Sequence, residues 1–314
     1  MNNVAVIGAG AWGTALAIQA HRAGRRVILW ARDPARAREM AETRRNPNLP
    51  SAVLPAEITV TNTLPTADLL LLAVPVQYLR AVAADLPPGP VAICAKGVER
   101  GTLALPLEIL GRPAAILTGP NFAHEIAAGL PAAAVVAAED PALCEAIAVA
   151  LGTPGFRLYA SPDPIGAQIG GAAKNVIAIA SGIVIGAGLG ENARAALVSR
   201  GLAEMSRLAV ALGGKAETVA GLSGLGDLVL TCAGTASRNY SLGLALGQGM
   251  PLGENFAERH AVTEGVATAP ALVARADAAG ASMPICAAVA GIVGGDVSVA
   301  VAIDALLSRP RRPE

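Results

Sequence analysis

The chain has 314 residues, 53% of them hydrophobic and 15% charged, which excludes general disorder and allows two domains with sizeable cores. Basic and acidic side chains balance at 24 each, so charge gives no reason to expect a nucleic-acid partner or an anionic membrane surface. The four scattered cysteines lack metal-ligand or redox spacing and the N-terminus lacks a basic signal-peptide start, so we expect a cytoplasmic protein without a bound metal.

The first 150 or so residues alternate short apolar runs with helical patterns, which is typical of a parallel sheet with crossover helices. Fully apolar runs of this kind suit a sheet covered on both faces. We therefore predict an α/β fold that begins with a doubly wound (Rossmann) dinucleotide-binding domain over residues 1–158. The predicted strands are Val4–Ile7, Val27–Trp30, Leu69–Val74, Val91–Ala95, Ala114–Leu117 and Ala132–Ala137, and the first predicted helix is Ala11–Ala23.

A G-x-G-x-x-G motif at Gly8, Gly10 and Gly13 follows the first predicted strand and opens the first helix. In this context the first glycine permits a tight turn, the second lets the backbone approach a pyrophosphate, and the third lets helix and sheet pack closely. First-turn N–H groups then face the phosphates at the positive end of the helix dipole. The alternative, in a chain with 35 glycines, is a glycine turn without a ligand.

The second predicted strand is followed by Arg32 and Asp33, where the adenosine ribose of a dinucleotide is expected. Sites selective for NAD usually place a carboxylate at this strand tip, whereas an arginine there pairs with the 2′-phosphate of NADP. Asp33 either compensates by holding the ribose hydroxyls or caps the helix that begins at Pro34. We expect NAD(P)H to be the cofactor, with NADPH favoured over NADH.

Beyond Tyr159 almost every segment is helical, so we predict an all-helical substrate-binding and catalytic domain over residues 159–314. Ser161-Pro162-Asp163-Pro164 is a helix-start signal, because capping residues precede a first-turn proline. Glycine-rich breaks are expected at Gly186–Gly190 and Gly221–Gly226, among others. The apolar stretch Ile165–Leu189 has the length of a membrane span, but it contains Gln168, Lys174 and Asn175 and is rich in small residues, so we expect a helix packed inside protein.

Only three of the 24 basic residues are lysines, and two of them stand where chemistry is expected. Lys174 lies midway along the apolar helix, where desolvation makes the neutral, basic form accessible to a proton-shuttling group. Lys96 follows a predicted parallel strand, and ligands collect beyond the carboxyl ends of such strands. A structural ion pair for Lys174 and a solvated strand-end side chain for Lys96 fit the local sequence equally well.

Ser237, Arg238 and Asn239 precede a helical pattern in the second predicted domain. Ser237 is a natural N-cap, so Arg238 projects from a helix start that already attracts anions. A guanidinium beside free N–H groups suits a phosphate, although an arginine in this place is otherwise a plain surface residue.

Nearly the whole chain resembles the bacterial NAD(P)-dependent glycerol-3-phosphate dehydrogenases. The order and spacing of several short motifs carry this resemblance, although any one of them is common by chance. They are GAGAWGTALA from Gly8, AKGVE from Ala95, GPNFAHEIAAGLP from Gly119, GGAAKNVIAIASG from Gly170, RGLAEMSRL from Arg200, GLSGLGDLVLTC from Gly221, SRN from Ser237 and VTEG from Val262.

The resemblance implies hydride transfer from NAD(P)H between dihydroxyacetone phosphate and sn-glycerol 3-phosphate, in a homodimer that supplies phospholipid synthesis. It also implies three sets of site residues. Lys174 is the catalytic acid/base, Asp227 orients and balances it, and Lys96 touches both cofactor and substrate. The substrate set adds Gly119, Asn121, Asn175, Ser237, Arg238 and Asn239. The cofactor set holds Gly8, Gly10, Ala11, Trp12, Gly13, Arg32, Lys96, Ala123, Arg238, Val262 and Glu264.

Four positions depart from the family pattern: Asn121 stands for serine or threonine, His124 for lysine, and Ala11 and Val76 each for serine. Two other functions stay open. One is a reductase of a small acid, such as a ketopantoate or 3-hydroxy acid enzyme, which needs a site for a carboxylate rather than a phosphate. The other is an NAD(P)-sensing protein without turnover, in which an ionisable group at position 96 or 174 is expected to be lost.

Overall fold

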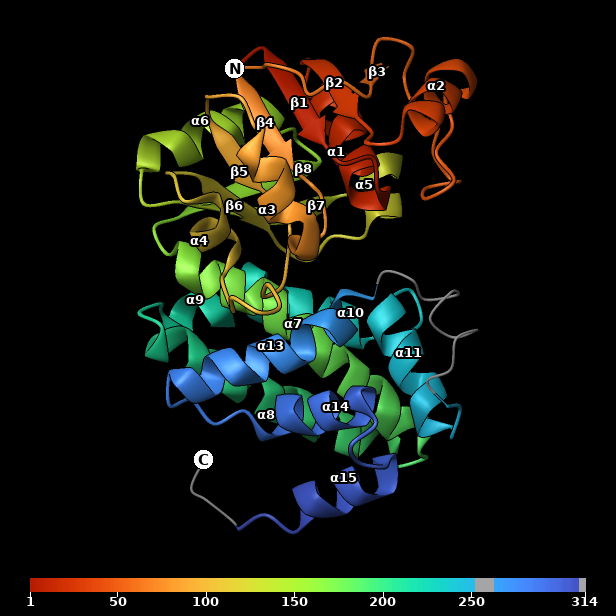
Figure 1. Cartoon of the computed structure of the whole chain (residues 1–314), viewed down its shortest axis with the longest axis vertical. Helices are drawn as coiled ribbons and strands as arrows, with labels where there is room; N and C mark the ends of the chain where they lie inside the picture. The colour runs from red at the N-terminus through yellow and green to blue at the C-terminus, as the bar shows by residue number, and fades with distance from the viewer. Residues whose placement is uncertain (252–262, 311–314) are drawn as a thin grey trace. The chain divides into compact units, whose positions relative to one another are not determined.

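One eight-stranded sheet organises the N-terminal part of the chain (Figure 1). Its strand order is β3-β2-β1-β4-β5-β6-β7-β8, and every neighbouring pair is parallel except β6 with β7. The strands are β1 (Asn3–Ile7), β2 (Arg26–Trp30), β3 (Thr59–Thr61), β4 (Leu69–Leu72), β5 (Val91–Ile93), β6 (Ala115–Thr118), β7 (Ala132–Ala137) and β8 (Phe156–Ser161). The strand order reverses at β1, so the carboxyl ends of β1 and β4 form the switch point where doubly wound sheets bind ligands.

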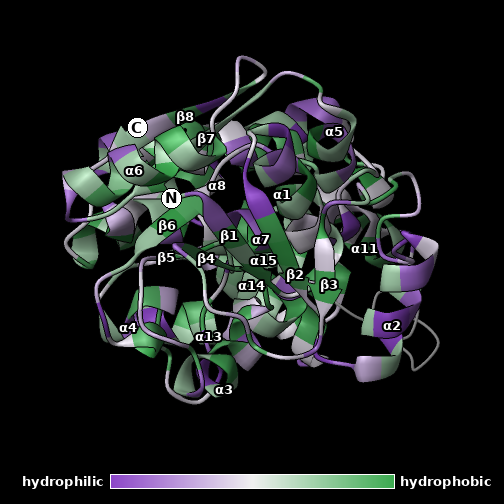
Figure 2. Cartoon of the chain, turned by 90° about the horizontal axis from the view of Figure 1, so that it is seen from above, coloured by the Kyte–Doolittle hydropathy of each residue, from purple (hydrophilic) through white to green (hydrophobic). Residues whose placement is uncertain are grey.

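Helices cover both faces of this sheet, and its central strands are strongly hydrophobic (Figure 2). Both features confirm the predicted Rossmann-like fold, because a sheet covered on both sides has no polar face. The core consists of side chains such as Val4, Leu29 and Leu71, which are fully buried. The helices of this part are α1 (Ala11–Arg22), α2 (Pro34–Thr43), α3 (Val76–Ala84), α4 (Pro106–Leu110), α5 (Ala123–Ala128) and α6 (Pro141–Leu151).

This computed structural model describes residues 1–251 and 263–310 of the chain. By its internal contacts the chain divides into a first unit, Met1–Lys96 with Ala104–Gln168, and a second unit, Gly97–Leu103 with Ile169–Glu314. This division differs from the boundary expected at residue 158, because β8 runs to Ser161 and pairs with β7 along its length. A short loop after β5 also belongs to the second unit, and no sequence pattern indicated it.

Apart from the loop Gly97–Leu103 and the connecting turns, the described residues of the second unit are helical, as predicted. Its helices are α7 (Pro164–Gly186), α8 (Gly190–Ala211), α9 (Ala216–Ala220), the π-helix η1 (Leu222–Gly226), α10 (Asp227–Cys232), α11 (Arg238–Gly247), α13 (Glu264–Ala278), α14 (Pro284–Gly294) and α15 (Val299–Leu307). The break expected at Gly221–Gly226 is instead a π-helical turn that runs directly into α10.

Helix α7 is the central element of the second unit, and 89% of its most apolar window is buried inside the protein. Burial within protein therefore accounts for its hydropathy. Two glycines let α11 lie directly against it: a Cβ at Gly182 would lie 2.1 Å from the Tyr240 carbonyl oxygen, and one at Gly243 would lie 1.9 Å from that of Ile179. This close approach brings the start of α11, with Arg238, to the helix that carries Lys174.

A buried carboxylate joins two further helices of this unit. Glu204 of α8 is 1% exposed and accepts hydrogen bonds from the Ile285 and Cys286 N–H groups, at 2.7 and 3.2 Å. These N–H groups lie in the first turn of α14, which lacks a side-chain cap of its own. Burial raises the pKa of Glu204 above its ordinary value, and the two hydrogen bonds partly oppose that shift.

Candidate functional site

Packing within the protein constrains two of the three glycines in the turn between β1 and α1. Gly8 has φ +118°, and a Cβ there would lie 2.9 Å from the Ala73 carbonyl. A Cβ at Gly13 would lie 1.9 Å from the Gly8 carbonyl oxygen. Neither position has room for a side chain, so these two glycines would be required whether or not a ligand binds.

Gly10 is different, because nothing in the protein requires a glycine there. Its φ of −77° is accessible to any residue, and a Cβ built on it meets no atom within 4 Å. It is the N-cap of α1, which has no side-chain cap and no acidic residue in its first turn. The Trp12 indole N–H is also buried without a partner among the described residues. An open space beside a helix start with spare donors fits the pyrophosphate of a dinucleotide.

The side chains after β2 separate the two roles that the sequence left open for Asp33. Asp33 is the N-cap of α2 and accepts a hydrogen bond from the Ala35 N–H at 2.9 Å, so the structure shows the capping role. Arg32 is exposed, and its guanidinium carbon lies 5.4 Å from the ring centroid of Tyr78 in α3. The exposed guanidinium of Arg32 beyond β2 is therefore accessible to a ligand.

Three of the predicted residues follow the carboxyl ends of β5 and β6 in the first unit. Lys96 is half-buried, and its Nζ donates to the Gly119 carbonyl at 3.5 Å. Asn121 donates through Nδ2 to the Ala133 carbonyl at 3.1 Å, while its Oδ1 is buried without a partner in the described structure. Ala123, at the start of α5, is half-buried.

Lys174 and Asp227 form a buried ion pair in the second unit. Lys174 is 8% exposed, Asp227 is fully buried, and Nζ lies 2.5 Å from Oδ1. Nζ also donates to the Thr231 hydroxyl at 3.0 Å, and that hydroxyl donates to the Asp227 backbone carbonyl at 2.6 Å. The carboxylate and the hydroxyl together fix the position and orientation of the Lys174 amine.

Thr231 is the residue of this group that the sequence reasoning missed. It lies four residues after Asp227 on the same helix, so both side chains face Lys174. The i, i+4 spacing was the available signal, but threonine in a helix usually bonds its own backbone, and the spacing alone does not indicate a function.

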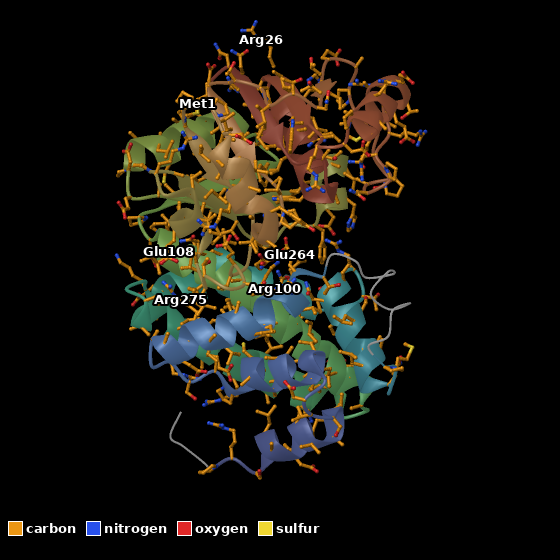
Figure 3. The ribbon with its side chains drawn as sticks, in the orientation of Figure 1. Met1, Arg26, Arg100, Glu108, Glu264 and Arg275 are labelled. Carbon is orange, nitrogen blue, oxygen red and sulfur yellow. The ribbon has the colours of Figure 1, made fainter. Side chains whose placement is uncertain are left out.

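A chain of hydrogen bonds connects the helices around this ion pair. The Gly265 N–H donates to Asn239 Oδ1 at 3.1 Å, Asn239 Nδ2 donates to Asn175 Oδ1 at 3.0 Å, and Asn175 Nδ2 donates to Glu264 at 3.5 Å. Because the backbone N–H can only donate, it fixes which end of each amide is the donor. Glu264 stands at the start of α13 (Figure 3).

The predicted phosphate-binding residues begin α11. Ser237 is buried and its hydroxyl accepts from the Tyr240 N–H at 3.3 Å, which confirms it as the N-cap. Arg238 is the first residue of the helix and is exposed. The first turn of α11 has no acidic residue. The Arg238 guanidinium and the free backbone N–H groups of that turn can therefore bind a dianion together.

Cys94 and Cys232 are buried thiols that are not available as nucleophiles near neutral pH. Cys94 is the buried residue directly after β5, and Cys232 is the last residue of α10. Burial raises the pKa of each of these thiols to about 12, so both stay protonated near neutral pH.

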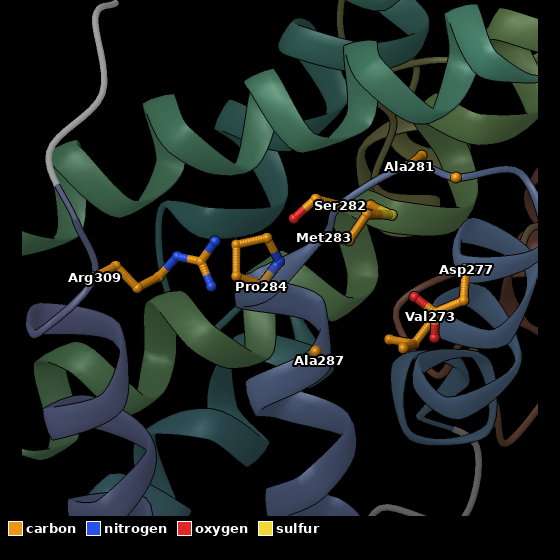
Figure 4. Close-up of a pocket in the computed structure, with 9 residues that line it drawn as sticks. Val273, Asp277, Ala281, Ser282, Met283, Pro284, Ala287 and Arg309 are labelled. Carbon is orange, nitrogen blue, oxygen red and sulfur yellow. The ribbon is translucent and has the colours of Figure 1, made fainter.

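The predicted site residues thus form two groups, one in each unit. The first unit holds Gly8, Gly10, Ala11, Trp12, Gly13, Arg32, Lys96, Gly119, Asn121 and Ala123, and the second holds Lys174, Asn175, Asp227, Ser237, Arg238, Asn239 and Glu264. Val262 lies outside the described residues. None of these residues lines the pocket drawn in Figure 4, which is bordered by α13, the start of α14 and Arg309.

A dinucleotide-binding sheet joined to a helical unit with a buried lysine is the arrangement of a two-domain nicotinamide-dependent dehydrogenase. The chain belongs to the NAD-dependent glycerol-3-phosphate dehydrogenase family. The family's N-terminal model matches residues 3–144, and its C-terminal model matches residues 163–304.

Curated relatives match along nearly their whole length. The chain is 56% identical to a glycerol-3-phosphate dehydrogenase [NAD(P)+] of Acidiphilium cryptum and 52% identical to one of Sphingopyxis alaskensis, covering 99% of this chain and 98% of the relative in each case. The crystal structure of glycerol-3-phosphate dehydrogenase from Coxiella burnetii superimposes with a TM-score of 0.89 at 35% identity, covering 98% of this chain and 99% of that one.

The different packing of the three turn glycines gives a direct test of the cofactor site. A Gly10→Ala variant should keep the melting temperature of the wild type, because its methyl group meets no protein atom, but should lose at least about tenfold in NADPH affinity by obstructing the pyrophosphate. Titration of NADPH fluorescence and thermal unfolding measure the two quantities. Gly13→Ala is the control and should unfold at lower temperature; unchanged NADPH affinity in Gly10→Ala would place the pyrophosphate elsewhere.

Proposed function

We propose that this chain interconverts dihydroxyacetone phosphate and sn-glycerol 3-phosphate with NAD(P)H as the hydride carrier. The observation that carries the proposal is the buried Lys174–Asp227 pair. Asn175, the next residue on α7, accepts a hydrogen bond from Asn239, which follows Arg238 on α11. A proton donor next to a cationic helix start suits a ketone that carries a phosphate. The family membership supports the same reaction.

Lys174 is proposed as the acid/base. The bound nicotinamide supplies or accepts the hydride at C2 of the substrate. Hydride addition to C2 leaves negative charge on the carbonyl oxygen, which the Lys174 ammonium stabilises more in the transition state than in the ground state. Nζ then donates its proton to that oxygen, while Asp227 and Thr231 hold the amine in place. In the reverse direction the same amine removes the proton from the C2 hydroxyl.

The substrate phosphate is proposed to bind at the start of α11, where Ser237, Arg238 and Asn239 lie. The hydrogen-bond chain through Gly265 supports this assignment. The Oδ1 atoms of Asn239 and Asn175 both accept from donors of the protein, so the two Nδ2 groups are the donors. Each Nδ2 has a second N–H, which suits a phosphate that accepts and never donates when fully ionised.

The first unit is proposed as the cofactor domain, with Ala11, Trp12, Arg32, Ala123 and the three turn glycines around the dinucleotide. Lys96 is proposed to contact both cofactor and substrate, with Gly119 and Asn121 near the glycerol end. Glu264, Val262 and Arg238 complete the proposed cofactor set. We propose that NADPH is favoured over NADH, supported by the exposed Arg32 and by the commitment of Asp33 to the α2 cap.

The cellular role is proposed on the same basis. Glycerol 3-phosphate is the backbone of phospholipids, and the enzyme is proposed to supply it in the cytoplasm. A homodimer built on the helical domain is proposed as the working form. Exposed apolar side chains of α15 support it, since Val301 is 56% and Leu307 is 77% accessible in the single chain.

Replacing Lys174 with alanine tests the proposed acid/base. Turnover of dihydroxyacetone phosphate should fall by roughly 10²–10⁴-fold, the usual contribution of a positioned acid/base, while NADPH affinity is retained. Steady-state kcat and NADPH fluorescence titration measure the two effects. The matched control is Lys215→Ala, which removes an exposed lysine at the start of α9 and should leave kcat near the wild-type value. Ordinary turnover in Lys174→Ala would remove the residue from the mechanism.

Replacing Arg238 tests the phosphate site. Arg238→Ala should lower kcat/KM for dihydroxyacetone phosphate by about tenfold or more and leave the low activity on unphosphorylated dihydroxyacetone nearly unchanged. Arg238→Lys should recover only part of the loss, because an ammonium lacks the two-pronged donor geometry. An equal loss on both substrates would remove the phosphate from Arg238 and leave it as a cofactor contact or with a general structural role.

The proposed cofactor preference is tested at Arg32. Because this side chain is exposed, solvent and salt screen its pairing with a 2′-phosphate, and Arg32→Ala should reduce kcat/KM with NADPH by about tenfold. The kcat/KM with NADH should change little. The control is Arg38→Ala, which removes an exposed arginine of α2 and should leave kcat/KM unchanged with both cofactors. A ratio of the two cofactors that stays constant in Arg32→Ala would assign the 2′-phosphate to other residues.

A further inference from the structure

A buried asparagine outside the glycine motif contacts that motif on two sides. Asn46 follows α2, is 1% exposed, and was not among the residues that the sequence singled out. Its Nδ2 donates to the Ala9 carbonyl at 3.0 Å and to the Thr14 hydroxyl at 2.5 Å. Ala9 lies inside the glycine turn and Thr14 in the first turn of α1, so one amide group binds both arms of the proposed pyrophosphate site.

The orientation of this amide is fixed by two donors on its other side. Asn46 Oδ1 accepts from Arg36 Nη2 at 2.7 Å and from the Asn48 N–H at 3.0 Å. Because a guanidinium and a backbone N–H can only donate, the oxygen must face them and the NH₂ group must face the glycine turn. The Asn46 side chain therefore makes four hydrogen bonds, and both N–H groups of its amide are directed at the turn.

Binding the Ala9 carbonyl determines where the next N–H points. The peptide between Ala9 and Gly10 is planar and trans, so its C=O and N–H groups point in opposite directions. With the carbonyl held toward Asn46, the Gly10 N–H faces away from it. A peptide flip would instead direct a carbonyl oxygen, which carries partial negative charge, toward the phosphates.

We propose that Asn46 is a positioning residue for the pyrophosphate of the cofactor. It does not touch the ligand; it holds the Ala9–Gly10 peptide and the first turn of α1 so that their N–H groups converge on the phosphates. This role rests on the proposed NAD(P)H site. It adds to the glycine motif a polar residue from a distant loop without which the turn is not held in its anion-binding conformation.

The test compares two ligands that share adenosine but carry phosphate at different positions: ADP-ribose has the 5′-pyrophosphate, and adenosine 2′-phosphate has its phosphate on the ribose 2′-oxygen. Asn46→Asp keeps the size of the side chain and both acceptor contacts, but loses both donors. Competition against NADPH should show the affinity for ADP-ribose reduced by about tenfold, and the affinity for adenosine 2′-phosphate, which has no phosphate at the turn, unchanged. Asn48→Ala is the control: its Nδ2 lies 3.5 Å from the same Ala9 oxygen, and both affinities should stay near wild type.

Thr14→Val provides a second variant with nearly the same shape, in case the aspartate does not fold. It removes one of the two acceptors of Asn46, and should weaken ADP-ribose severalfold without affecting adenosine 2′-phosphate. Equal losses on both ligands, or unchanged ADP-ribose affinity in folded Asn46→Asp, would overturn the proposal. Failure of the wild type to bind NADPH would instead refute the proposed function, so the two failures are distinguishable.

Discussion

The proposed chemistry of Lys174 depends on one constraint: a lysine buried in its charged form needs a partner of opposite charge. Removing both charges from water is costly, and the cost is offset only when the pair has good geometry and further hydrogen bonds. Lys174 meets these conditions through Asp227 at 2.5 Å and the Thr231 hydroxyl at 3.0 Å. The same contacts fix the amine in space, so the interaction that stabilises the buried lysine also gives it the fixed orientation that the proposed proton donor requires.

Backbone close approach then places the other groups around that amine. Gly182 and Gly243 let α7 and α11 touch, which brings Arg238 and the Asn239 amide to the helix of Lys174. In the first unit Gly8 and Gly13 shape the turn in the same way, and Asn46 holds it from outside. Each site therefore consists of a tight backbone contact that sets position and a polar side chain that sets orientation.

The sequence predicted what depends on local pattern. Strands buried on both faces, the helix that begins at Pro164, and the Ser237 cap follow from apolar runs and capping residues, and all are present. The missed strands, β3 and β8, lie at the edges of the sheet, where partial exposure mixes polar with apolar residues and removes the signal. Thr231 and Asn46 could not be predicted because their partners are distant in sequence: Thr231 bonds Lys174, and Asn46 bonds Ala9.

Oxidation of NADPH by the purified wild-type chain, followed by absorbance, distinguishes the possible reactions when dihydroxyacetone phosphate, unphosphorylated dihydroxyacetone and ketopantoate are compared as substrates. We expect rapid oxidation with dihydroxyacetone phosphate, formation of sn-glycerol 3-phosphate, and a much lower kcat/KM for the other two. Faster turnover of ketopantoate would contradict the phosphate site and favour a small-acid reductase. NADPH binding without turnover of any of the three would contradict the acid/base role of Lys174 and favour a sensing protein.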